Sequence, residues 1–138
     1  MISKHFDIRE LVPPEIHSVR GDNSWELLDG RLIFMLDDLW DNVGPFVVND
    51  WHKGGTYKES GLRSSGTSTG AKYSQHKFGR AVDAKFKNKT PQEAHAFILA
   101  NPDKFPYVTT LEAIGATPTW VHCDCRNHNS PGIKVVAP

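Results

Sequence analysis

The sequence predicts an α+β fold in which two or three helices pack on a small, mainly antiparallel sheet. Three observations predict it: an amphipathic helical repeat between residues 23 and 42, a helix-start signal at 90–93, and strict alternation at 119–125. With 138 residues and 38% hydrophobic content, the chain can bury one core. We therefore expect a single domain over residues 1–138.

The N-terminal third predicts two helices. Asp7 precedes Glu10 by three residues, which is the spacing of a capping pair, and the prolines at 13–14 should stop this first short helix. The main helix should run from residue 23 or 24 to residue 42 and end at the Gly-Pro pair 44–45. Its apolar residues recur every three or four positions and are expected in the core: Trp25, Leu28, Leu32, Leu36, Leu39 and Trp40.

The middle of the chain alternates short elements with one long polar stretch. A short strand should begin at 46–48 and lead into a polar segment up to residue 73. Gly, Ser and Thr dominate residues 60–70, and a loop of that length in a small domain is commonly functional. A capping residue, a proline and an acid start a helix that should run over 90–100, with His95 on its surface.

The C-terminal third predicts a β-hairpin. Strands are expected at 107–112 and 119–125, and their closeness in the sequence favours antiparallel pairing. That pairing would bring Glu112 near His122. The tail at 132–138 is a candidate edge strand.

Three metal ligands are candidates for one site. His76 and Asp83 are seven residues apart across a loop, and His122 lies on the alternating C-terminal segment. Two imidazoles and a carboxylate suit zinc, and three protein ligands leave a fourth position open for water, as in catalytic sites. Non-haem iron uses the same ligand types, so ligand type alone does not identify the metal.

Alternation in the last strand separates chemistry from packing. Trp120, His122 and Asp124 should face one side, while Cys123 and Cys125 face the other as buried, reduced thiols. Asp124 could orient His122 through the second ring nitrogen, and Trp120 would form a wall of the cleft. The competing assignment makes Asp124 a direct ligand in place of the acid at position 83.

Composition and charge exclude several function classes. Lys plus Arg and Asp plus Glu number 16 each, which disfavours binding to nucleic acids. No apolar run approaches the roughly 20 residues that span a bilayer, so membrane insertion is not expected. The N-terminus lacks the apolar middle of a signal peptide, and synthesis in the cytoplasm is expected.

Two ordered motifs carry a family resemblance. The segment SQHKFGRAVD, which contains His76 and Asp83, resembles a Ser-x-His-x-x-Gly-x-Ala-x-Asp signature, and TWVHCDC around His122 resembles Trp-x-His-x-Asp. These are signatures of the zinc D-Ala-D-Ala carboxypeptidase and L-alanyl-D-glutamate endopeptidase family, whose fold is shared with the hedgehog signalling domain. GLRSSG around Arg63 and VTTLE before Glu112 extend the match.

The resemblance implies roles for further residues. Arg63 would hold the substrate, where its planar guanidinium can bind a carboxylate or a polarised carbonyl. Hydrolysis also needs a base and an acid, and Glu112 is the candidate for both. It precedes His122 by ten residues, a wider gap than in some relatives, so the turn between them must fold back. Glu59 is the reserve, and Ser74 should brace the histidine loop or touch the substrate.

The function expected from this resemblance is cleavage of the stem peptide of bacterial peptidoglycan with one Zn²⁺ ion. A phage-type endolysin with L-alanyl-D-glutamate endopeptidase activity is favoured, acting as a monomer and reaching the wall, through the host periplasm, after release from the cytoplasm. One alternative is a D-Ala-D-Ala carboxypeptidase. Another is a non-catalytic, zinc-stabilised binding or structural module of a phage particle.

Overall fold

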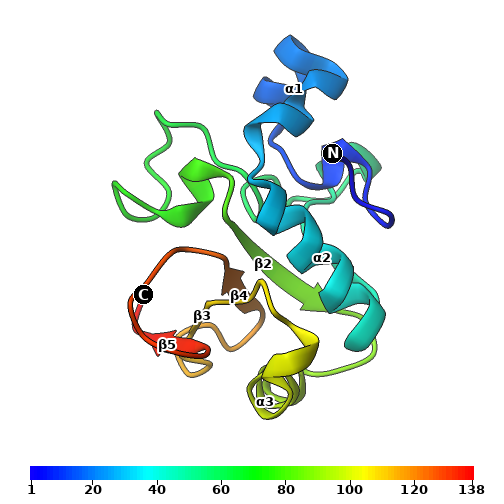
Figure 1. Ribbon diagram of the computed structural model, residues 1–138. Coiled ribbons are helices and arrows are strands. Elements are labelled where there is room, and N and C mark those ends of the chain that lie inside the picture. Colours follow the sequence, from blue (N-terminus) through cyan, green and yellow to red (C-terminus); the bar gives the residue numbers. More distant parts are fainter.

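The computed structural model describes residues 1–138 and shows the α+β architecture expected from the sequence (Figure 1). Three α-helices are present: α1 (Pro14–Arg20), α2 (Gly30–Asn42) and α3 (Pro91–Ala100). The sheet has the order β1-β2-β4-β3-β5 and is formed by β1 (Phe46–Val47), β2 (Ala81–Phe86), β3 (Thr110–Glu112), β4 (Val121–Asp124) and β5 (Lys134–Val136). All pairs are antiparallel except the β3/β5 pair.

Five short 3-10 helices complete the chain: η1 (Ile8–Glu10), η2 (Gly21–Leu27), η3 (Trp51–Lys53), η4 (Gln75–Phe78) and η5 (Pro102–Lys104). The predicted capping pair at the N-terminus is confirmed, because Asp7 and Glu10 form a reciprocal capping box on η1. The prolines at 13–14 end this element as expected. They also begin α1, which the sequence reasoning did not predict, because Pro14 occupies the favoured first position of a helix.

The predicted main helix is wrong in its first part. The chain forms η2, extends at Leu28 and only then enters α2. Asp29 causes the break, since its side chain accepts a hydrogen bond from the Arg31 amide as an N-cap, and its own amide donates to the Gly79 carbonyl at 3.0 Å. The helix ends at Asn42 as expected.

The register of the sheet brings the C-terminal hairpin to the centre. Strands β3 and β4 pair as predicted, with Thr110 opposite Asp124, and β2 pairs with the other edge of β4, with Asp83 opposite His122. Asp83 and His122, two of the three metal-ligand candidates, are therefore cross-strand neighbours. The tail forms the edge strand β5.

The two faces of the sheet differ in character. One face contributes Val82 and Ala84 of β2 with Cys123 of β4 to the single core of 24 buried residues, which also includes the apolar side of α2. The two cysteines are free and buried, as expected, and burial raises the pKa of Cys125 to about 11, so it stays a thiol. The opposite face carries the polar side chains.

Helix α3 confirms the predicted start, because Thr90 and Glu93 form a capping box and Pro91 occupies the first turn. The prediction that His95 lies on its surface is wrong. His95 is 8% exposed, and its Nε2 lies 3.2 Å from the main-chain carbonyl of Glu112. The helix packs against β2 and β4, and the contact with Glu112 places His95 against β3. None of the helices is long and apolar enough to cross a bilayer.

Candidate metal centre

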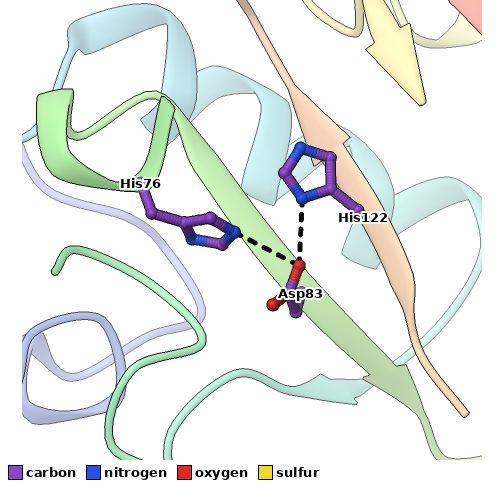
Figure 2. Close-up of side chains that lie close together, drawn as sticks. All are labelled: His76, Asp83 and His122. Atoms are coloured by element: carbon purple, nitrogen blue, oxygen red, sulfur yellow. Dashed lines mark hydrogen bonds and ion pairs between the residues drawn. The ribbon is translucent and has the colours of Figure 1, made fainter. Parts of the chain in front are cut away.

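Three separate elements deliver the three ligand candidates to one point (Figure 2). His76 comes from η4, Asp83 from the middle of β2 and His122 from β4. Ser74 caps η4 by accepting a hydrogen bond from the His76 amide at 3.3 Å, which confirms that it braces this loop. Gly79 ends η4 with φ of 67°, and a Cβ there would lie 2.3 Å from a backbone carbonyl of Leu27.

The ligand atoms are close enough to share one ion. Oδ1 of Asp83 lies 3.3 Å from Nε2 of His76 and 3.0 Å from Nδ1 of His122, and the three atoms all lie within 4.8 Å of one another. Ligands at about 2.0–2.1 Å from zinc in a tetrahedron are separated by about 3.3 Å. All three residues are buried. The group can therefore hold a metal ion.

In each imidazole, the hydrogen bond of one ring nitrogen determines that the other ring nitrogen faces the site. Nδ1 of His76 lies 2.8 Å from the Gly61 carbonyl, which can only accept, so this nitrogen carries the proton and Nε2 presents a lone pair. Nε2 of His122 lies 2.9 Å from Oδ2 of Asp124, which leaves Nδ1 for the ion. Metal-bound histidines usually have such partners, so the residues present fit a metal.

Asp124 occupies the position of an orienting residue. Its carboxylate is fully buried, and it also accepts hydrogen bonds from Nε and Nη2 of Arg126. It reaches the far nitrogen of His122 and not the point that the three ligands share. The competing assignment, in which Asp124 replaces Asp83 as a ligand, does not agree with this geometry.

The carboxylates and the imidazole control each other's protonation. Burial would raise the pKa of Asp83, but the adjacent imidazoles of His122 and His76 outweigh it and keep the pKa of this carboxyl below its ordinary range. Burial would lower the pKa of His122, but its bonds with Asp124 and Asp83 raise that pKa to about 9. A divalent cation would take the place of the proton on Nδ1.

Glu112 and Arg63 both reach the centre. Oε1 of Glu112 lies 3.2 Å from Nδ1 of His122, the nitrogen that faces Asp83, so the predicted turn does fold back. Arg63 contacts Oδ2 of Asp83 through Nη2 at 3.4 Å and donates from Nε to the Glu59 carbonyl at 2.7 Å. The carboxylate of Glu59 points elsewhere and accepts from Thr67 at 2.7 Å, so Glu59 is not a base at this centre.

A cleft of about 300 Å³ opens over the ligands, and we call it the metal cleft. The expected residues Arg63, Ser74, Glu112 and Trp120 line it. The contributors that sequence reasoning missed include Tyr73, Arg126 and the segment 136–138. The same two-residue alternation that places His122 and Asp124 on one face would have suggested Arg126. No sequence signal marked the C-terminal segment, because its position depends on the parallel pairing of β5 with β3.

No protein-family model, curated protein or solved structure matches this chain. The description of the site therefore depends on its own geometry.

Proposed function

We propose that this chain is a zinc-dependent peptidase that cleaves the stem peptide of bacterial peptidoglycan at the L-alanyl-D-glutamate bond, in the manner of a phage endolysin. The observation that supports it best is the position of Glu112. Its carboxylate lies 3.2 Å from the same imidazole nitrogen that faces Asp83, so a proton carrier borders a three-ligand metal site. Metal-assisted hydrolysis needs this combination.

Zinc is the proposed metal because two neutral imidazoles and one carboxylate are a common zinc donor set. A bound zinc ion would supply a Lewis acid that polarises the scissile carbonyl and makes water more acidic. The buried side chains of His76, Asp83 and His122 would hold the ion and shield it from solvent on the protein side. The same three residues line the metal cleft, where a peptide can enter.

Glu112 is the proposed proton carrier. Oε1 takes a proton from the attacking water and gives it to the departing amine nitrogen, so the C–N bond breaks without releasing an amide anion. His95 holds the main chain of this residue through its contact with the Glu112 carbonyl at 3.2 Å. The pairing of β3 with β4 and β5 fixes the same strand from both sides.

Two arginines of the cleft are the proposed binding groups for a carboxylate of the peptide. Arg63 and Arg126 both line it, and each already holds a carboxylate of the site, Asp83 and Asp124 respectively. A planar guanidinium can bind a carboxylate or the scissile carbonyl. The stem peptide carries free carboxylates, including that of its D-glutamate. The family resemblance of the two sequence motifs supports the same substrate.

The test uses zinc-loaded protein and purified sacculi, with released peptides identified by mass spectrometry. We expect new N-terminal D-glutamate and new C-terminal L-alanine. Release of D-alanine alone would support the carboxypeptidase alternative, and zinc binding without release would support a non-catalytic module. Glu112→Gln should bind zinc normally and lose about 100-fold or more in rate. The matched control Glu26→Gln changes an exposed glutamate outside the cleft and should retain full activity.

A further inference from the structure

A second hollow of about 410 Å³ adjoins the metal cleft, and we call it the side hollow. It shares Arg63, Asp83 and Trp120 with the metal cleft, so the two hollows lie side by side. Its remaining lining residues are Thr56, Tyr57, Lys58, Glu59, Ser60, Thr69 and Lys85. None of the proposed hydrolytic steps uses this space.

The lining of the side hollow combines two aromatic rings with a polar rim. Tyr57 and Trp120 are its only hydrophobic members, and Tyr57 is 47% exposed. The rim offers hydroxyl, ammonium and carboxylate groups of both charge signs. Rings provide flat apolar surface with a polar tip, and a mixed rim can bond to hydroxyl and amide groups. This chemistry fits a neutral, hydroxyl-rich ring better than a charged side chain.

The aromatic part is held in place before any ligand binds. Nζ of Lys85 lies 4.0 Å from the centroid of the Tyr57 ring and donates to the Val48 carbonyl at 2.6 Å and to Oγ of Ser60 at 2.9 Å. The main-chain amide of Tyr57 donates to Oδ1 of Asp50 at 2.9 Å. A pre-ordered surface binds with a smaller loss of conformational entropy.

The distance from the metal centre selects which part of the substrate can reach the side hollow. Lys85 follows Asp83 by two positions on the same face of β2, about 7 Å along the strand. In cleavage between L-alanine and D-glutamate, one residue and the lactyl group separate the scissile carbonyl from the muramyl sugar. That is about 7 Å at 3.3–3.6 Å per step. In D-alanine removal, four residues and the lactyl group separate them, which is about 17–18 Å at the same length per step.

We propose that the side hollow binds the N-acetylmuramyl sugar to which the stem peptide is attached, with the sugar ring against Tyr57 and Trp120. This inference rests on the proposed function for the identity of the ligand. It adds that the enzyme prefers stem peptides still linked to glycan. It also predicts how the substrate lies in the two hollows: the part before the scissile bond lies over β2, and the leaving amine points toward Arg126.

The test has a kinetic arm and a binding arm. Zinc-loaded protein is given the disaccharide-linked tetrapeptide or the free tetrapeptide, and we expect kcat/KM to be at least 10-fold higher for the linked form. Tyr57→Ala should reduce this preference toward one. The control Phe34→Ala removes a 44% exposed ring on α2, outside both hollows, and should keep the preference. Equal rates for the two substrates, or an equal loss on both in Tyr57→Ala, would overturn the proposal.

The binding arm needs no turnover. The peptide-free disaccharide of N-acetylglucosamine and N-acetylmuramic acid is titrated into the labelled wild-type protein, and we expect NMR shifts of the Trp120 indole and the Tyr57 amide. Such shifts without hydrolysis of sacculi would leave the sugar site standing and remove the proposed function. Hydrolysis without shifts and without glycan preference would do the reverse.

Discussion

Replacement of Asp124 by asparagine tests whether the hydrogen bond between this carboxylate and His122 strengthens zinc binding. The carboxylate is fully buried and lies 2.9 Å from Nε2 of His122, so it holds the ring with Nδ1 toward the ion. The amide keeps the shape but not the charge. Losing such a partner typically weakens metal binding 10- to 100-fold, or about 1.4–2.7 kcal/mol. We also expect the metal-free fold to lose about 1–3 kcal/mol, because Arg126 loses its charged partner and one of its two acceptor oxygens.

The assay is competition for zinc against a chromophoric chelator at pH 7.5, with circular dichroism as the check on folding. Asp103→Asn is the matched control, because this residue is exposed on η5 and lies away from the ligands. Its zinc Kd should equal that of the wild type. A folded Asp124→Asn protein with a Kd within about twofold of the wild type would refute the idea that this carboxylate orients His122.

Three further predictions address other parts of the molecule. Thr90→Ala removes the N-cap of α3 and should lower the free energy of unfolding in urea by about 1 kcal/mol without changing zinc affinity. Gly70 and Gly132 have φ of 75° and 71°, so alanine at either position should lower the free energy of unfolding by about 1–2 kcal/mol. At Gly70 the new Cβ would also lie 2.5 Å from Nη1 of Arg63, whereas at Gly132 it would meet no atom. Gly70→Ala should therefore raise KM for the stem peptide, and Gly132→Ala should not. In EDTA, the pKa of about 9 for His122 lies above its unfolded value of 6.5, so this residue stabilises the fold fully below about pH 6.5 and the effect is lost as pH rises through 9. The free energy of unfolding in urea should fall by about 3 kcal/mol over this pH range, and a His122→Gln protein should not show this fall.

Local signals were sufficient for much of the fold. The capping box at Thr90 and Glu93 located α3, and the alternation around His122 assigned the two faces of β4 correctly. The C-terminal hairpin followed from short sequence separation. These features depend on a few consecutive residues, so the chain displays them directly.

The errors come from contacts between distant segments. The apolar repeat continues through Leu28, but the amide of Asp29 bonds to the carbonyl of Gly79, fifty residues away, and the helix restarts there. We predicted His95 at the surface because the pattern of its neighbours on α3 does not indicate its contact with β3. The role of Lys85 likewise appears only once the strands are paired. A pattern within one element does not encode its partner.

Zinc titration of dialysed protein by isothermal calorimetry tests the central claim most directly, namely that His76, Asp83 and His122 hold one divalent ion. We expect one zinc ion per chain in the wild type and no specific binding in Asp83→Asn, with both proteins folded by circular dichroism. Absence of zinc binding in the wild type, or unchanged stoichiometry and affinity in Asp83→Asn, would contradict the account.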